Sequence, residues 1–244
     1  MNELKDQVVV FGGGTGSVGE GMVRTLLEEG ARVVVPCRSA EKRQRLEKYV
    51  ADLQGAELLC LDANVGDEAS VQAFRNDLRS RVDRIDLGIA CLGGWYYGYS
   101  LHRMPFADWQ RVLLNNLTTH FLFMRAILSL MHDQNHGTYV MINGGASEVI
   151  APESGMISIV AAAQRMMTRV LAEEARGKDV RVYSVVAFDA VKTRDRRGEV
   201  LDEWLSPEDV AHYVTDLHTG RASHLEQPIH TLHTRDDVHW APAS

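Results

Sequence analysis

The feature that most constrains the fold is a regular alternation of short apolar runs with helical stretches. The apolar runs are rich in β-branched residues and cover 7–11, 31–36, 56–61, 85–91, 137–142 and 180–187. Stretches with helical spacing follow them, at 19–30, 40–53, 67–81, 105–131, 154–175 and 206–218. Residues 227–233 read as a last strand, with Pro228 indicating an edge or a start. The pattern predicts an α/β fold with a largely parallel, seven-stranded sheet and helices on both faces.

Length and composition fit one large domain over residues 1–244. The net charge is -7 and the basic residues are scattered, which argues against nucleic acid as a partner. No segment approaches the roughly 18 apolar residues of a membrane span. The start, "MNELKDQVVVF", lacks the long apolar stretch of a signal peptide. Three cysteines suggest a reducing compartment, so we expect a cytoplasmic protein without membrane contact.

A glycine-rich turn follows the first strand, in "VVVFGGGTGSVGEG". Gly13, Gly16 and Gly19 let the backbone turn tightly and approach a pyrophosphate, whose charge the next helix N-terminus would hold. The alternative is a turn that binds nothing. The position between a strand and a helix favours a dinucleotide site.

The end of the second strand, "VVVPCRS", bears on which dinucleotide binds. An NAD site usually places an acid here for the ribose 2′-hydroxyl, but this chain has Cys37, Arg38 and Ser39. A guanidinium suits a 2′-phosphate, although Arg38 could also be a solvated residue at a helix start. We therefore expect NADP(H) in preference to NAD(H).

These motifs, together with "LDANV", "IACLGG", "LLNNLTTHFL" and "VRVYSVVAFDAVKT", resemble the short-chain dehydrogenase/reductase family over nearly the whole chain. The resemblance implies a doubly wound Rossmann-type domain. It also implies that Asp62 accepts from the adenine amine, that Ala63 lies beside the ring, and that Thr193 holds the nicotinamide amide. The full set of expected cofactor residues is Gly13, Thr15, Gly16, Ser17, Val18, Gly19, Arg38, Ser39, Asp62, Ala63, Leu92, Gly93 and Thr193.

The resemblance fails at the family's catalytic Ser, Tyr and Lys. Aligning the fifth strand and the following helix places Gly144, Ile157 and Ala161 at these positions. Only the asparagine of the long helix is kept, as Asn116. A positioned acid or base is worth about 10²–10⁴ in rate. Ordinary alcohol–ketone interconversion is therefore not expected.

Other side chains near the site are candidates to replace the missing acid. Tyr97 or His102, in the aromatic segment "GGWYYGYSLH", could donate a proton, or the segment could pack against another subunit. Glu148 is read as a solvated loop carboxylate rather than a displaced acid, and His120 as a structural histidine. His224, His230, His233 and His239 cluster near the C-terminus, but no metal site is expected, because His230 and His233 would point to opposite faces of a strand over 227–233.

Three functions stay open. The first is an NADP(H)-dependent oxidoreductase that passes hydride to an acceptor already activated, such as an iminium. The second is a non-redox lyase, isomerase or cyclase, and the third a non-catalytic NADP sensor or scaffold. The aromatic segment suggests an aromatic or apolar small molecule as substrate. The apolar helices 106–131 and 154–175, which pair subunits in the family, predict a homodimer or homotetramer.

Overall fold

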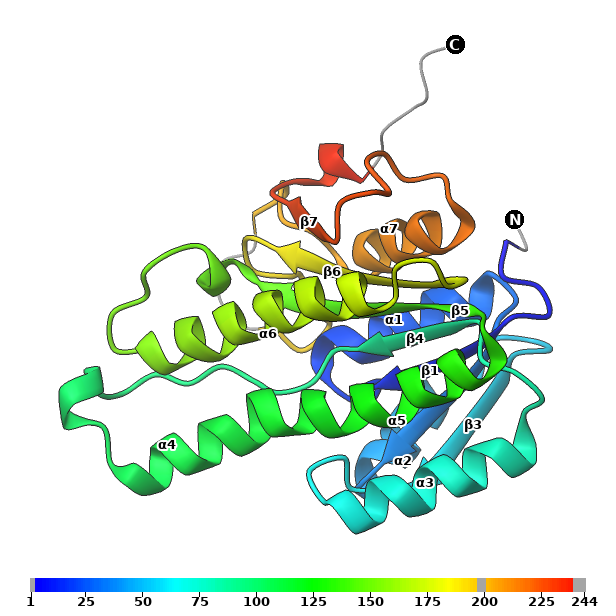
Figure 1. The fold of residues 1–244 in the computed structure, drawn as a ribbon, viewed down its shortest axis with the longest axis horizontal. Coiled ribbons are helices and arrows are strands. Elements are labelled where there is room, and N and C mark those ends of the chain that lie inside the picture. Colours follow the sequence, from blue (N-terminus) through cyan, green and yellow to red (C-terminus); the bar gives the residue numbers. More distant parts are fainter. Residues whose placement is uncertain (1–2, 197–200, 239–244) are drawn as a thin grey trace.

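The computed structural model describes residues 3–196 and 201–238. Its seven strands form one parallel sheet in the order β3-β2-β1-β4-β5-β6-β7, as the sequence predicts (Figure 1). The strand order reverses between β1 and β4, so the crevice above their carboxyl ends is where such folds bind ligands. The strands are β1 (Val8–Gly12), β2 (Arg32–Cys37), β3 (Glu57–Asp62), β4 (Leu87–Ala90), β5 (Gly137–Gly144), β6 (Val180–Ala187) and β7 (Ile229–Leu232).

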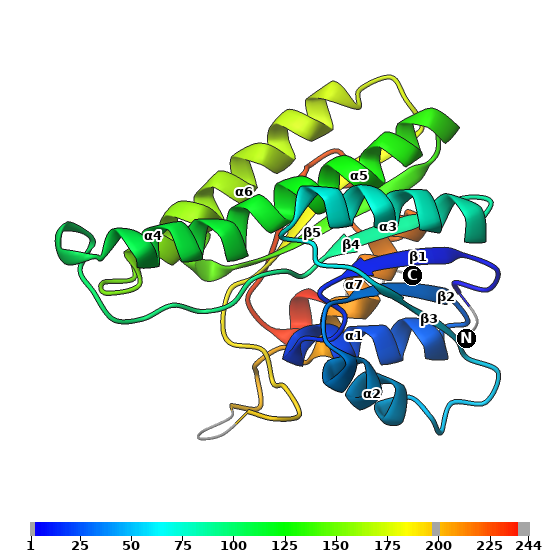
Figure 2. The ribbon, with the colours of Figure 1, turned by 90° about the horizontal axis from the view of Figure 1, so that it is seen from below.

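Helices cover both faces of the sheet (Figure 2). Alternate strand residues point to opposite faces, so Val9 and Phe11 pack in one apolar core while Val10 packs in the other. The first core is closed by α1 (Ser17–Glu28), α2 (Ala40–Tyr49) and α7 (Pro207–Thr219). The second is closed by α3 (Glu68–Arg81), α5 (Thr119–Gln134) and part of α6 (Gly155–Glu174).

The long helix predicted from residue 105 is continuous but not regular. It comprises α4 (Phe106–Leu113), a π-helical turn at Leu114–Thr118, and α5. It ends at Asn135, which takes the left-handed conformation with φ 50°. A π turn shifts the hydrogen-bond register within a helix, and such turns are frequent at functional sites. The turn contains Asn116.

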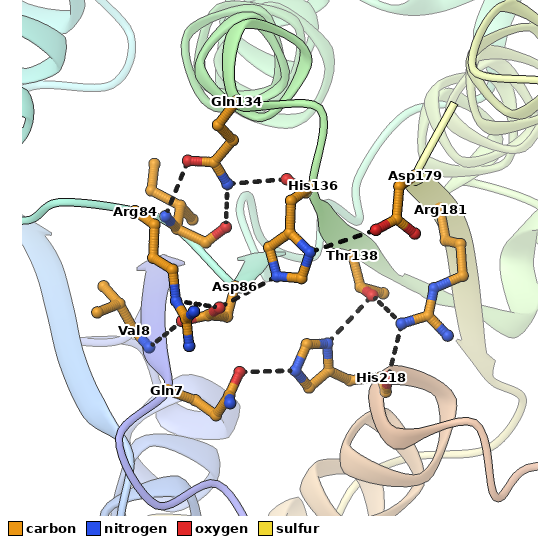
Figure 3. Close-up of polar contacts among 11 residues, drawn as sticks. Gln7, Val8, Arg84, Asp86, Gln134, His136, Thr138, Asp179, Arg181 and His218 are labelled. Carbon is orange, nitrogen blue, oxygen red and sulfur yellow. Dashed lines mark hydrogen bonds and ion pairs between the residues drawn. The ribbon is translucent and has the colours of Figure 1, made fainter. Parts of the chain in front are cut away.

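Polar side chains gather at the amino end of the sheet, where β1, β4, β5 and β6 begin (Figure 3), and Asp86 and Thr138 among them are buried. Asp86 has no exposed surface. Its carboxylate accepts from the Val8 N–H at 2.8 Å and pairs with Arg84 Nε at 2.8 Å and His136 Nε2 at 3.2 Å. β4 begins at Leu87, not at residue 85, although the Asp86 backbone already bonds to Val8 and Thr138 on the neighbouring strands.

A second part of this amino-end network surrounds His218, near the end of α7 (Figure 3). Its ring nitrogens lie 3.1 Å from Thr138 Oγ1 and 3.3 Å from Gln7 Oε1. Arg181 donates to the same Thr138 hydroxyl at 2.9 Å and to the His218 carbonyl at 2.7 Å. Together the two parts tie the first residues of four elements to one another.

The C-terminal strand is shorter than predicted. β7 ends at Leu232, so His233 lies beyond it and the argument about opposite faces does not apply. His230 is buried between the Tyr213 hydroxyl and the Gln227 carbonyl, each at 2.9 Å. No cluster of three or more metal-ligating side chains occurs within 3–196 and 201–238, and His239 lies outside those residues. No described helix combines the length and apolar character of a membrane span.

Candidate functional site

The turn between β1 and α1 can be built only with glycine at key positions. Gly13 has φ +89°, and a Cβ there would lie 2.0 Å from the Cys91 carbonyl oxygen. A Cβ on Gly19 would lie 2.2 Å from the Gly13 carbonyl oxygen. The tight turn brings the N-terminus of α1, with its unpaired N–H groups, to the carboxyl edge of the sheet. Such a terminus attracts an anion.

A cavity of about 350 Å³ opens beside this turn, across the ends of β1, β2, β3 and β4. Nine of the side chains or glycines expected at the site line it: Gly13, Thr15, Gly16, Arg38, Ser39, Ala63, Leu92, Gly93 and Asn116. The remaining expected residues, Ser17, Val18, Gly19, Asp62, Thr193, Tyr97 and His102, are not among those that line it. The cavity is therefore built where sequence reasoning places the adenosine and pyrophosphate of a dinucleotide.

One end of the cavity carries positive charge. Arg38 follows β2 and is exposed, and Ser39 is the N-cap of α2, where its hydroxyl accepts from the Lys42 N–H. Lys42 also lines the cavity, one helical turn after Arg38, and sequence reasoning missed it. Its spacing from Ser39 on an N-capped helix was the available signal. Arg38, Ser39 and Lys42 can together surround a phosphate.

The end of β3 supplies a flat wall for the same cavity. Ala63 is buried and its N–H donates to the Cys37 carbonyl at 3.1 Å. Asn64, Val65 and Gly66 continue the wall and were not expected. Asp62 is exposed instead, and its carboxylate is paired with Arg43 of α2.

The loop after β4 wraps closely around the Asn116 amide. A Cβ on Gly93, which has φ +98°, would lie 2.2 Å from Asn116 Oδ1, and the Gly94 N–H donates to that oxygen at 2.8 Å. The Asn116 backbone carbonyl, in the π turn, accepts from Gln164 Nε2 of α6 at 2.5 Å. Gln164 is buried and sequence reasoning missed it, because its partner is 48 residues away in the chain.

The helix α6 presents hydrocarbon beside this loop. Ile157 and Ala161 are buried, at 8% and 5% exposure. Gly144 ends β5, and apart from its chain neighbours no described atom lies within 4 Å of where its Cβ would be. The Asn143 amide joins the two elements, because its oxygen accepts from the Gly144 N–H and its nitrogen donates to the Ala161 carbonyl. None of these side chains can exchange a proton near neutral pH.

Comparison with known proteins identifies the family. The family model described as enoyl-(acyl carrier protein) reductase matches residues 13–224. The chain belongs to the short-chain dehydrogenase/reductase family. It is 25% identical over 243 residues to dehydrogenase/reductase SDR family member 4 of Rattus norvegicus, covering 92% of this chain and 85% of that protein. It is 25% identical over 242 residues to the 3-oxoacyl-[acyl-carrier-protein] reductase FabG of Aquifex aeolicus (strain VF5), covering 91% and 94%.

Solved structures share the fold of this short-chain dehydrogenase/reductase. A metagenomic short-chain oxidoreductase in complex with NADP superposes with a TM-score of 0.79 at 23% identity, covering 95% of this chain and 97% of that one. The protein described as gox2181 superposes with a TM-score of 0.85 at 20% identity, covering 98% and 99%. At these identities the likeness establishes the fold, which is that of a nicotinamide-dependent oxidoreductase family.

The aromatic segment after Gly94 divides into buried and exposed parts. Tyr96 is buried against Ile157, and its hydroxyl donates to Asp108 at 3.4 Å. Tyr97 is 68% exposed and donates to Glu153 at 2.5 Å, a bond that raises the pKa of the phenol. His102 is exposed in a short turn. The fold thus brings Trp95 and Tyr96 to the cavity but not Tyr97 and His102.

His120 and Glu148 both have structural partners. His120 is fully buried, with Nε2 3.0 Å from the Leu92 carbonyl, and burial lowers the pKa of its ring to about 4. Glu148 pairs with Arg165 at 2.6 Å and accepts from the Thr231 hydroxyl at 2.9 Å. Glu148 is an exposed loop residue, as expected, and its carboxylate is also held by these two partners. Burial also raises the pKa of the Cys91 thiol to about 12, which keeps it a neutral apolar group.

Proposed function

We propose that this short-chain dehydrogenase/reductase binds NADP(H) and exchanges hydride with an acceptor that is already activated, such as an iminium. The proposal rests on one observation: two features of the candidate site lie next to each other. A cradle suited to a dinucleotide runs along the carboxyl edge of the sheet. The helix face beside it, at Ile157 and Ala161, carries only hydrocarbon.

The charge at the cavity end supports a preference for NADP(H). Arg38 and Lys42 supply a guanidinium and an ammonium, and Ser39 supplies a hydroxyl, around one end of the cavity. β2 ends in Cys37, so the chain offers no carboxylate there for a free ribose 2′-hydroxyl. A 2′-phosphate would meet favourable charge at this point. A structural neighbour of the chain was solved with NADP.

The hydrocarbon face supports an acceptor that needs no proton. Reduction of a ketone forms an alkoxide, which an acid must protonate, and we infer that Gly144, Ile157 and Ala161 stand where the family's acid machinery would be. Hydride transfer from NADPH to an iminium carbon instead gives NADP⁺ and a neutral amine. Both electrons of the hydride enter the new C–H bond, and the C=N π electrons become the nitrogen lone pair. No side chain has to donate or accept a proton in that step.

One observation favours a non-catalytic NADP sensor as the second candidate. Asn116, Asn143 and Gln164 fill the region between β5, the π turn and α6, and each amide is already engaged with the backbone. Carboxamide side chains can hold the site rigid through hydrogen bonds, but they cannot act as general acids. The third candidate, a lyase, isomerase or cyclase that uses Tyr97 or His102, would require these exposed side chains to move into the cavity.

The test is the oxidation of NADPH, followed by its absorbance, with a cyclic iminium and with the ketone of the same ring size. We expect turnover of the iminium and none of the ketone, and we expect Arg38→Ala to raise the KM for NADPH. Reduction of the ketone at a comparable rate would contradict the proposal. Tight binding of NADPH without turnover of either acceptor would support the sensor.

We also infer that residues 1–244 act as one domain and assemble as a homodimer or homotetramer in the cytoplasm. Exposed apolar side chains on the π turn, α5 and α6 support the assembly: Leu114, Phe121, Ile159, Met166 and Val170. Such side chains on neighbouring helices favour contact with another subunit. Light scattering at micromolar concentration tests the inference, and a monomer would contradict it.

A further inference from the structure

The cavity at the carboxyl edge of the sheet extends beyond the part lined by Arg38 and Lys42. A second part is bordered by residues 63–66, which follow β3, and by the π turn and the first residue of α5. These two borders meet, because a Cβ on Gly66 would lie 3.6 Å from Thr119 Cγ2. We call this second part the crevice, and it is lined by residues 63–66, 94–95, 114–115 and 119.

The carboxylate expected to recognise adenine does not line the crevice. Asp62 is paired with Arg43 of α2, and its side chain is 91% exposed. The crevice offers two carboxamides instead, those of Asn64 and Asn115. Asn64 is engaged, because its Oδ1 accepts from the Gly66 N–H at 3.1 Å. The Asn115 carboxamide makes no hydrogen bond with any residue of 3–196 or 201–238, so it is available to a ligand.

Trp95 lies beside Asn115 at the crevice. Their chain neighbours are joined by a hydrogen bond, in which the Gly94 N–H donates to Asn116 Oδ1 at 2.8 Å. A Cβ on Gly93 would also lie 3.2 Å from the Asn115 carbonyl oxygen. The loop after β4 is thus in contact with the π turn at this point, and Trp95 and Asn115 both line the cavity next to the contact. An indole and a free carboxamide therefore border the same part of the cavity.

The Trp95 indole has no partner in the described part of the chain. It is 68% exposed, and it makes no hydrogen bond, aromatic stacking or cation–π contact there. Tyr96 differs, because it is buried and its hydroxyl donates to Asp108 at 3.4 Å. An exposed indole beside a cavity gains apolar contact when a flat ring covers it. The Trp95 side chain is thus suited to a planar ligand.

We propose that Trp95 and Asn115 bind the adenine ring of the cofactor, the indole on its face and the carboxamide at its edge. The proposal rests on the proposed binding of NADP(H). With the 2′-phosphate at Arg38 and the pyrophosphate at the N-terminus of α1, the adenosine ribose would lie between them in the same cavity. The base on that ribose would then occupy the part of the cavity that neither group fills, which is the crevice.

The chemistry of the two side chains matches adenine. The amide oxygen of an asparagine can accept from the exocyclic amine of adenine while the amide nitrogen donates to N7. A carboxylate could only accept at this edge, so Asn115 offers one contact more than Asp62 would. Stacking of a base on an aromatic side chain adds enough affinity for an alanine substitution to reveal it.

The first test is calorimetric titration with NADPH and with 2′,5′-ADP, which contains the adenosine and its phosphates but no nicotinamide. Trp95→Ala should weaken both ligands about tenfold, because the stacking contact is lost. Trp95→Phe keeps an aromatic face and should recover most of the affinity. Tyr99→Ala is the matched control, because Tyr99 is exposed in the same segment but does not line the cavity. It should bind both ligands like the wild type.

Tryptophan fluorescence separates a direct contact from an indirect effect on the fold. A base stacked on Trp95 should quench the emission of the wild type when 2′,5′-ADP binds. Trp95→Phe should bind the same ligand without this quenching, although the chain keeps its three other tryptophans. Quenching that persists undiminished in Trp95→Phe would overturn the stacking contact.

Asn115→Ala tests the contact at the edge of the base, with the reduced form of nicotinamide hypoxanthine dinucleotide phosphate as the second ligand. An oxygen replaces the adenine amine in this dinucleotide, so the wild type should bind it about threefold to tenfold more weakly than NADPH. Asn115→Ala should lose most of this difference. A difference that is as large in Asn115→Ala as in the wild type would overturn the role of Asn115.

The outcomes distinguish this inference from the proposed function. Unchanged affinity of Trp95→Ala for 2′,5′-ADP would overturn the inference and leave the proposed function standing. A loss of affinity for NADPH alone would also overturn it, because Trp95 would then contact the nicotinamide half. If the wild type binds neither NADPH nor 2′,5′-ADP, the proposed cofactor site itself is wrong and the inference with it.

Discussion

The two ends of the parallel sheet differ in how their polar groups are used. At the amino end, Asp86, His136 and His218 bond to backbone and side-chain partners from four elements (Figure 3). At the carboxyl end, Arg38 and Lys42 line an open cavity, beside a glycine turn whose helix terminus carries free N–H groups. Polar groups that are satisfied within the fold stabilise it, whereas groups left unsatisfied are available to a ligand. We therefore assign a structural role to the amino end and propose a binding role for the carboxyl end.

The largest effect is expected from removing the carboxylate at the amino end. Asp86→Ala would leave the Val8 N–H, Arg84 and His136 without their shared partner, and loss of hydrogen bonds to a buried charged group costs about 1.5–3 kcal/mol of unfolding free energy. Urea denaturation measures this loss. Asp83→Ala, three residues away and exposed, should stay within about 0.5 kcal/mol of the wild type. An unfolding free energy of Asp86→Ala close to that of the wild type would contradict the structural role that we assign to the amino end of the sheet.

The pH dependence of stability should also originate at the amino end. Burial, reinforced by Arg181 and His136, lowers the pKa of His218 from 6.5 to about 4, although Asp86 opposes the shift. The unfolded chain therefore takes up a proton before the folded chain as the pH falls. His218 therefore contributes its full share of the free energy of unfolding above pH 6.5. This contribution falls by about 2–3 kcal/mol as the pH is lowered toward 4.

His218→Gln should weaken the dependence of the unfolding free energy on pH between 6.5 and about 4. Denaturation at several pH values measures this dependence. His120, whose pKa is lowered to about 4 by burial at the other end, would still contribute in the same window. An unchanged slope in His218→Gln would show that the group does not titrate as described.

The sequence predicts the fold well where the signal is local. β6 spans Val180–Ala187 as expected, because an apolar run is bounded there on both sides, and Ser206 caps α7 with Pro207 in its first turn. The start of β4 was predicted at residue 85 instead of Leu87, because an apolar run does not mark the residue at which strand pairing begins. Lys42 was missed although it lies three residues after the N-cap Ser39, a spacing that can be read from the sequence.

Gln164 could not be found from the sequence in the same way. It binds the carbonyl of a π turn that no local pattern predicts. Its role depends on how the helices meet across the sheet. Sequence reasoning therefore locates the backbone cradle of the candidate site but not the side chains that brace it.

Restoring an acid to the carboxyl end tests the account of the chemistry. The triple change Gly144→Ser, Ile157→Tyr and Ala161→Lys should give ketone reduction at least about 100-fold above the wild type. Gly144 has open space for the added hydroxyl, whereas a lysine at the buried Ala161 costs several kcal/mol if it finds no partner. NADPH oxidation with a ketone and a thermal melt would be measured together. A folded, NADPH-binding variant without activity would contradict the assignment of these positions.

The most direct test of the central claim, that the carboxyl end is an NADP(H) site, is calorimetric titration of the wild type with NADPH and NADH. The account predicts that NADPH binds at least about tenfold more tightly, because Arg38 and Lys42, which line the cavity, would face the 2′-phosphate. In Arg38→Ala this preference should fall, with the stability unchanged. Equal affinity for the two dinucleotides, or a preference that survives in Arg38→Ala, would contradict the account.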